Sequence, residues 1–172
     1  MPSRDIESIY NACSRMVYWA AYSVTRKESD AMDAMQNTFL RAMAHMDQLQ
    51  QMNDAQLKAW LYRVAVNLCK DALRKQRWEA PAEELPEPSV ESAYDLPEAA
   101  AVSAAERAQI RAAIDRLPDI YRETVLLHYF SGCDYKEIAR LMHTTEGNVK
   151  SRMSRAKQRL YSILKEGGED CG

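Results

Sequence analysis

The 172-residue sequence has only five glycines, few strand-forming residues and no long apolar run. Because none of its apolar runs approaches the length of a bilayer span, we expect no membrane insertion. The first residues, MPSRDIESIY, lack the charged-then-apolar layout of a signal peptide, so we expect a cytoplasmic protein. Hydrophobic residues make up 47% of the chain, enough for a packed core. Alanine, methionine, leucine and glutamine abound, which favours an all-α fold.

Cysteine is also scarce, and its placement excludes several kinds of site. The four cysteines, at positions 13, 69, 133 and 171, are widely spaced and form no CxxC pair. Disulfides are uncommon in the cytosol, and the three histidines do not provide the spacing of a metal site. No nucleophile–base set and no phosphate-binding loop is present. We therefore expect no enzyme, no cofactor and no metal.

Basic residues are absent from one long segment. Between Glu79 and Glu106 there are eight acidic residues and no basic one, and four of the six prolines lie between Pro81 and Pro97. An acidic, proline-rich segment without periodicity is typical of a flexible linker. The sequence thus predicts two small helical domains joined by a flexible acidic linker. The predicted parts are an N-terminal domain over residues 1–78, the linker over 79–103, a C-terminal domain over 104–166 and a tail over 167–172.

Helical periodicity predicts three helices in the N-terminal domain. The first carries an apolar series over residues 6–24, and the second starts at Ser29 or Asp30 and ends near Met46. Residues 47–53 have no apolar period and are predicted to form a loop. Asp54 is the expected N-cap of a third helix that reaches about Trp78.

Four helices are predicted in the C-terminal domain, over residues 104–116, 118–130, 134–142 and 145–165. Pro118 suits the first turn of the second of these. Asp134 and Glu137 have the spacing of a capping box, and Thr145 is a suitable N-cap for the last helix. The short HTT segment between the last two helices predicts a tight turn.

The third helix is expected to carry a cationic stripe on one face. Its members recur at steps of four and three along the chain: Arg63, Asn67, Lys70, Arg74 and Arg77. Another face should pack in the core: Leu57, Leu61, Val64, Leu68 and Ala72. Trp60 lies one turn before the start of the stripe. Cations, an amide and an aromatic ring on one face suit single-stranded DNA. The alternative is a solvated surface helix with a tryptophan in the core.

The last helix of the C-terminal domain is strongly basic, although the whole chain has a formal net charge of -2. Its apolar seam comprises Val149, Met153, Ala156, Leu160 and Ile163. Its outer residues are Asn148, Arg152, Arg155 and Arg159, flanked by Lys150, Ser151 and Ser154. A short helix, a tight turn and a longer basic helix form the helix-turn-helix layout. The second helix of that motif enters the major groove of DNA.

Together these segments resemble the bacterial extracytoplasmic-function (group IV) sigma factors of the sigma-70 family over nearly the whole chain. The matching stretches are DAMDAMQNTFLRAM, LKAWLYRVAVNLCKDALRK and LPDIYRETVLLHYFSGCDYKEIARLMHTTEGNVKSRMSRAKQRL, in the family's order. The resemblance implies a sigma subunit that joins core RNA polymerase, through its β and β′ subunits, and directs it to promoter DNA. It also implies control by an anti-sigma factor. Two other functions remain open from the residues alone: an operator-binding regulator that uses only the helix-turn-helix, and a protein-interaction module.

The resemblance also implies roles for individual residues. Positions of the polymerase-docking motif are occupied by Asp33, Gln36, Asn37, Phe39 and Leu40. The -10 segment corresponds to Trp60, Arg63, Asn67, Lys70, Arg74 and Arg77, with residues 47–53 at the place of a pocket for a flipped base. The -35 helix corresponds to Asn148, Lys150, Ser151, Arg152, Ser154, Arg155 and Arg159. For Phe39, Leu40 and Trp60, packing in the core is the alternative.

Overall fold

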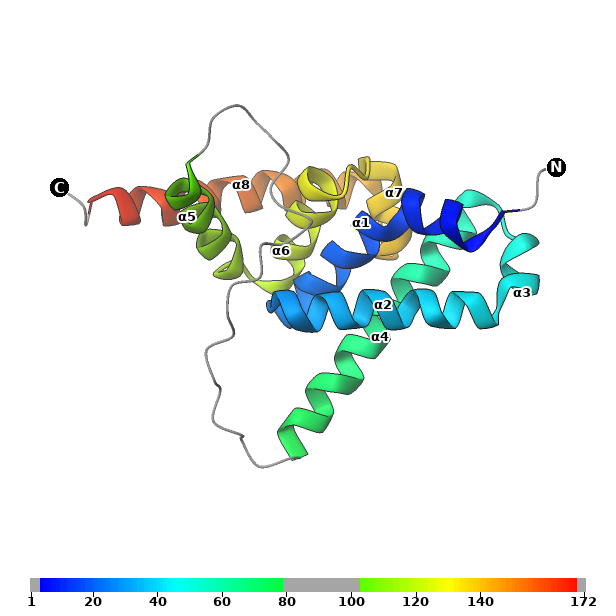
Figure 1. Cartoon of the computed structure of the whole chain (residues 1–172). Helices are drawn as coiled ribbons and strands as arrows, with labels where there is room; N and C mark the ends of the chain where they lie inside the picture. The colour runs from blue at the N-terminus through cyan, green and yellow to red at the C-terminus, as the bar shows by residue number, and fades with distance from the viewer. Residues whose placement is uncertain (1–3, 79–102, 170–172) are drawn as a thin grey trace. The chain divides into compact units, whose positions relative to one another are not determined.

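The computed structural model describes residues 4–78 and 103–169, and every regular element in these two ranges is helical (Figure 1). The chain divides into two compact units, residues 1–95 and 96–172. The predicted all-α architecture with two helical domains is therefore confirmed. The predicted linker lies outside the described residues, apart from its last residue, Ser103.

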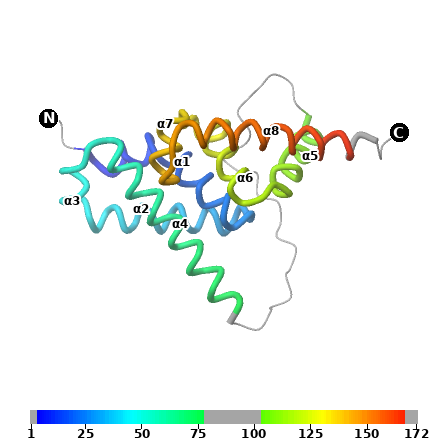
Figure 2. Tube along the Cα trace, turned by 180° about the vertical axis from the view of Figure 1, so that it is seen from behind, coloured from blue at the N-terminus to red at the C-terminus, as the bar shows by residue number. Residues whose placement is uncertain are grey.

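The first unit consists of three long helices and one short helix. They are α1 (Ile6–Thr25), α2 (Glu28–Ala44), α3 (Met46–Gln50) and α4 (Asp54–Trp78). Helices α1, α2 and α4 pack against one another in pairs. In both views the last turns of α4 extend past α1 and α2 (Figures 1 and 2). That part of α4 therefore has few neighbours within its own unit.

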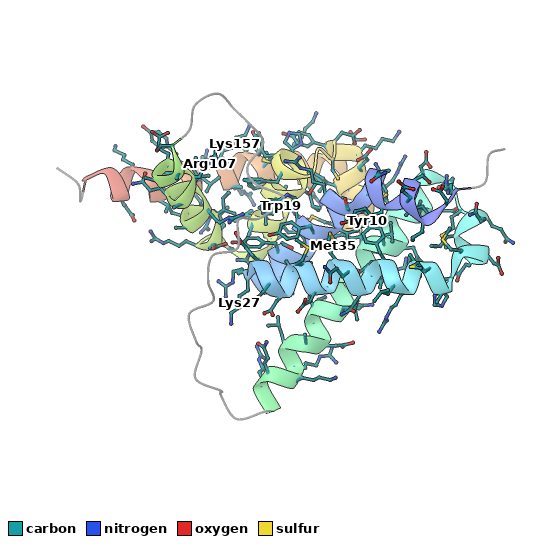
Figure 3. The ribbon with its side chains drawn as sticks, viewed as in Figure 1. Tyr10, Trp19, Lys27, Met35, Arg107 and Lys157 are labelled. Carbon is teal, nitrogen blue, oxygen red and sulfur yellow. The ribbon has the colours of Figure 1, made fainter. Side chains whose placement is uncertain are left out.

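Large side chains fill the centre of the first unit. Trp19 of α1, Met35 of α2 and Leu61 of α4 are each almost completely buried, and Figure 3 labels the first two. Tyr10 packs edge-on against Phe39, with ring centroids 4.9 Å apart. Fully burying a side chain such as Met35 or Leu61 stabilises the folded state by about 1.5–3 kcal/mol. These buried side chains therefore fix how the three helices pack.

Two predicted boundaries in this unit were wrong. The predicted loop over residues 47–53 contains most of α3, because Leu49 is fully buried and anchors a helical turn. The N-cap of α4 is Asn53, not Asp54: the Asn53 Oδ1 atom accepts a hydrogen bond from the Gln56 amide at 2.8 Å, and the Gln56 side chain accepts one from the Asn53 amide at 3.0 Å. These bonds form a capping box. Asp54 pairs with Arg4 instead, at 2.5 Å.

The buried face of α4 also differs from the predicted one. Its fully buried residues follow steps of four: Leu57, Leu61, Ala65 and Cys69. Val64 and Leu68 are only half-buried, and Ala72 is exposed. The prediction for Ala72 was wrong. Apolar residues at helical spacing show which face of α4 is apolar, but they do not show how far along α4 the neighbouring helices reach.

The second unit is built around its last helix. Its elements are α5 (Ala104–Asp115), α6 (Asp119–Val125), the π-helix η1 (Leu126–Phe130), α7 (Tyr135–Leu141) and α8 (Glu146–Glu169). Helix α8 packs against α5, α6 and α7. Val149 and Met153 of α8 are buried with Ile138 of α7, as the apolar seam predicted. The predicted single helix over 118–130 is two elements, with Pro118 as the N-cap and not in the first turn.

The helix-turn-helix agrees with the sequence prediction in its local details. The Asp134 carboxylate accepts a hydrogen bond from the Glu137 amide at 2.8 Å, and the Thr145 hydroxyl accepts one from the Asn148 amide at 3.1 Å. Between the helices, His143 has a φ of 53°, and the Thr144 amide donates to the Ala139 carbonyl at 2.9 Å. A left-handed residue therefore follows the C-cap of α7, and α8 begins at a side-chain cap.

We expect the substitution Asp134→Ala to lower the free energy of unfolding by about 1 kcal/mol, because the cap of α7 is lost. Urea unfolding followed by circular dichroism measures this change. Asp134→Asn is the control, since asparagine caps helices as well as aspartate does. Equal losses in both variants would mean that the carboxylate does not act as a cap.

Candidate nucleic-acid interface

The cationic stripe predicted on α4 is exposed along its whole length. Its side chains all lie on the side away from Leu61 and Ala65: Arg63, Asn67, Lys70, Arg74 and Arg77. Arg74 comes within 4.0 Å of Asp71, but both side chains are mostly exposed, so this pair contributes little to stability. The stripe therefore presents a row of cations and one amide to solvent.

A hollow of about 450 Å³ lies at the start of the stripe. Its lining comes from the end of α3, the turn after it and the first turns of α4: Gln48, Gln51, Met52, Gln56, Ala59, Trp60 and Arg63. Trp60 is half-buried, and its ring centroid is 5.7 Å from that of His45. Glutamine amides both donate and accept hydrogen bonds, and an indole ring offers a stacking face. The hollow thus combines the groups that bind an unstacked nucleobase.

In the second unit, the outward side of α8 is polar and mostly exposed. Six of the seven predicted -35 residues are exposed. Five of them form what we call the crest: Asn148, Lys150, Ser151, Ser154 and Arg155. The Asn148 side-chain amide donates to the Thr144 hydroxyl at 3.0 Å, so its orientation is constrained. A crest of small hydroxyls and one arginine can approach base edges in a major groove.

The two remaining predicted arginines of α8 lie along its α6-facing edge. Arg152 is half-buried, and the Arg159 guanidinium lies 5.2 Å from the centre of the Tyr121 ring. On the opposite edge, the Lys157 amine lies 5.8 Å from the centre of the Tyr129 ring (Lys157 is labelled in Figure 3). Cations held over aromatic rings are attracted to them and lose freedom. Arg152 was predicted on a fully outward face, but its side chain is half-buried.

Glu123 of α6 is the titratable group most affected by this packing. Burial raises the pKa of its carboxyl group to about 7, and the positive charge of Arg152 opposes that shift. Glu123 could not be singled out from the sequence, because its burial depends on how α6 packs in the folded unit. The glutamines of the hollow were missed for a similar reason, since α3 was predicted to be a loop.

Four of the five residues predicted for polymerase docking are exposed on α2. Asp33, Gln36 and Asn37 are exposed, and 61% of the Leu40 side chain is accessible. Phe39 is 5% exposed and packs against Tyr10, so its assignment to a docking surface is corrected to a core role. Leu40 and Met43, three residues apart on α2, are two large apolar side chains that the described residues leave exposed, 61% and 55%.

The described residues show none of the features of a metal site. Within residues 4–78 and 103–169, no three His, Cys, Asp or Glu side chains are grouped so that they could hold a metal ion. Cys13, Cys69 and Cys133 are buried, and burial raises the pKa of Cys69 to about 12. Burial also raises the pKa of Cys13, so the thiols of Cys13 and Cys69 stay protonated near neutral pH. None of the described helices combines the length and apolarity needed to cross a bilayer.

Comparison with known proteins identifies both units. Residues 9–79 match the family model of sigma-70 region 2, and residues 107–160 match that of sigma-70 region 4. The chain is 32% identical over 169 residues to the ECF RNA polymerase sigma factor SigM of Bacillus subtilis (strain 168), covering 96% of this chain and 98% of SigM. It is 33% identical over 153 residues to the ECF RNA polymerase sigma factor EcfG of Rhodopseudomonas palustris (strain TIE-1). That match covers 88% of this chain and 81% of EcfG.

A solved structure supports the same assignment. The sigma factor RpoE of Bartonella quintana, in complex with the anti-sigma factor NepR, matches with a TM-score of 0.67 and 26% sequence identity. The match covers 92% of this chain and 96% of RpoE. The resemblance predicted from the sequence is confirmed: this chain belongs to the ECF sigma factors of the sigma-70 family.

Proposed function

We propose that this sigma factor joins core RNA polymerase and directs it to promoters by using two separate DNA-contacting surfaces. The observation that carries the proposal is the presence of one exposed cationic surface in each unit, the stripe on α4 and the crest on α8. Each surface alone binds weakly. Held together on the polymerase, the two act at high effective concentration on one promoter.

The stripe on α4 is proposed to bind the opened -10 strand. Arg63, Lys70 and Arg74 pair with successive phosphates, and Asn67 contacts a base that has left the stack. The hollow beside Trp60 receives that base. Splaying out a base costs a few kcal/mol, and stacking and phosphate pairing offset this cost. The action is one of binding, without a covalent step, and takes place in the cytoplasm.

The crest of α8 is proposed to bind the -35 element as a duplex. Arg155 is long enough to reach a base edge, and Lys150 pairs with a phosphate. Ser151 and Ser154 are small, so the helix can lie deep in the major groove and donate hydrogen bonds there. Phosphate pairing releases counterions, so this binding should weaken steeply as salt rises.

Helix α2 is proposed to dock onto the polymerase through Asp33, Gln36, Asn37 and Leu40. We expect Leu40→Glu to weaken binding to core polymerase about tenfold, since a charge replaces the apolar contact of this surface. Fluorescence anisotropy of the labelled chain with core enzyme measures the loss. Leu40→Met keeps the apolar bulk and should bind like the wild type. Unchanged binding of Leu40→Glu would place the docking surface elsewhere.

An anti-sigma factor is proposed as a further partner. RpoE of Bartonella quintana was solved with its anti-sigma factor NepR, and this chain matches RpoE along nearly its whole length. A protein that covers the docking residues of α2 or the crest of α8 would prevent initiation. Leu40 and Met43 of α2, 61% and 55% exposed, are apolar groups that such a partner could bury.

A run-off transcription assay tests the proposal. The chain is mixed with core polymerase and genomic promoter fragments, and the transcripts are sequenced. Initiation at defined sites that requires both proteins is the expected result. Tight binding to operator-like sites without polymerase, together with no initiation, would instead support a regulator that uses only the helix-turn-helix. A regulator of that kind would have no use for the exposed stripe on α4, so the stripe disfavours this alternative.

A further inference from the structure

Arg4, which precedes α1, is bonded to the place where α3 meets α4. Its guanidinium donates to the Met52 carbonyl at 2.6 Å and to the Asp54 carboxylate at 2.5 Å. Its backbone amide donates to the Gln50 side-chain oxygen at 2.9 Å, and the Gln50 side-chain amide donates back to the Arg4 carbonyl. We call residues 50–54 the junction. Arg4 therefore holds the junction at three alternate residues.

Arg4 is itself held in place by the start of α1. The next residue, Asp5, is the N-cap of that helix, and its carboxylate accepts a hydrogen bond from the Ser8 amide at 2.7 Å. The Ser8 hydroxyl donates in turn to the Asp5 carbonyl at 2.9 Å. Because α1 packs against both α2 and α4, Arg4 is a fixed point from which the junction can be held.

Of the two guanidinium contacts, the bond to Met52 has the larger effect on the junction. The Asp54 side chain is 86% exposed, so its ion pair with Arg4 is screened by water and contributes little. The Arg4 side chain is 29% exposed, and its bond to the Met52 carbonyl is partly buried. A hydrogen bond from a charged donor is stronger than a neutral one, and losing it there leaves the carbonyl without this partner.

The junction forms part of the wall of the hollow beside the stripe. Gln51 and Met52 line the hollow together with Trp60. Gln56 lines it as well and is tied to the junction by the capping box with Asn53. A shift of the junction therefore moves the polar groups of the hollow relative to the indole ring. Since a base is recognised by the placement of donors and acceptors, such a shift changes which base fits best.

We propose that Arg4 is a positioning residue of the -10 interface: it holds the junction so that the hollow fits one base better than the other three. The inference rests on the proposed function of the hollow. Gln50 has the same role from the side of the junction, because its side chain bonds to the backbone of Arg4. Neither residue lines the hollow. Both act by ordering the lining before the base arrives, which lowers the entropy cost of binding.

The substitution Arg4→Met removes the guanidinium and keeps an unbranched side chain. We expect the preference of the hollow for its best base over the other three to shrink about fivefold, the effect of losing one or two hydrogen bonds. Gln50→Ala should reduce the same preference. The double variant should lose little more than either single variant, because both substitutions break one bridge. Arg4→Lys can still donate to the Met52 carbonyl and should restore part of the preference.

The experiment uses the full chain assembled with core RNA polymerase. Selection from single-stranded DNA randomised over the -10 region yields the preferred strand, and each position is then changed to the other three bases. Fluorescence anisotropy of the labelled strands gives the affinities. The position that the hollow reads is the one whose preference is lost in Trp60→Ala.

Arg15→Met is the charge-matched control, because Arg15 is an exposed arginine of α1. Loss of a cation there should lower the affinity for all strands alike and leave the preference among bases unchanged. Gln50 is exposed, so Gln50→Ala keeps the inference testable even if Arg4→Met does not fold.

The outcomes separate the inference from the function beneath it. If no position loses its preference in Trp60→Ala, the proposed function of the hollow fails. If one does, but Arg4→Met and Gln50→Ala keep the wild-type preference there, Arg4 does not position the junction. A loss of affinity in Arg4→Met that is equal for all four bases would also overturn the inference, since it would reflect only the removal of a positive charge.

Discussion

Replacing Arg155 by alanine is expected to weaken binding of the holoenzyme to its -35 duplex by about 1–3 kcal/mol. Arg155 is the arginine of the crest, exposed and not covered by α6. A guanidinium in that position can donate two parallel hydrogen bonds to a guanine edge, and its rigid planar fork fixes their geometry. Competition binding with duplexes changed at single positions measures both the loss of affinity and the loss of selectivity.

The pattern of the loss distinguishes two roles of Arg155. If the guanidinium reads a base, the variant loses affinity for the preferred duplex and stops distinguishing one base pair. If it contacts a phosphate, the affinity falls for all duplexes alike and the salt dependence becomes shallower. Arg159→Ala is the matched control, because Arg159 lies over Tyr121 and should contribute less. Equal affinities of wild type and Arg155→Ala would remove Arg155 from the interface.

Features that depend on a few adjacent residues could be predicted from the sequence. The cap of α7 needs only Asp134 and an amide three residues later, and the cap of α8 needs only Thr145 and the amide of Asn148. Such contacts form as the helix itself forms, whatever packs around it. The charged face of α4 was predictable for a related reason, since cations at helical spacing avoid a core.

Features that depend on a distant partner could not be predicted in the same way. The pattern on α2 placed Phe39 beside Leu40, but only the packing of α1 buries the first and leaves the second accessible. Similarly, Arg152 and Arg155 look equivalent in sequence and differ because α6 meets one edge of α8. In this protein, tertiary packing selects which members of a polar face remain free for recognition.

Replacing Asn67 by alanine is expected to impair promoter opening more than initial binding to duplex DNA. Asn67 is exposed on the stripe, one turn after Arg63, which lines the hollow. Its amide can pair with the Watson–Crick edge of a base only after that base has left the stack, and such a pair contributes about 1–3 kcal/mol. Permanganate footprinting of the -10 region should therefore show about tenfold less open complex, whereas gel-shift affinity at low temperature stays close to that of the wild type.

The distinction between opening and binding follows from the geometry of the stripe. Arg63, Lys70 and Arg74 carry full charges and attract duplex and single strands alike, so removing any one of them should weaken both steps. Asn67 is neutral, so its loss affects only the state in which its partner base is available. Asn11→Ala, at an exposed asparagine of α1, is the matched control and should melt promoters normally. Normal permanganate reactivity in Asn67→Ala would show that strand capture depends on the cations and the hollow, without this amide.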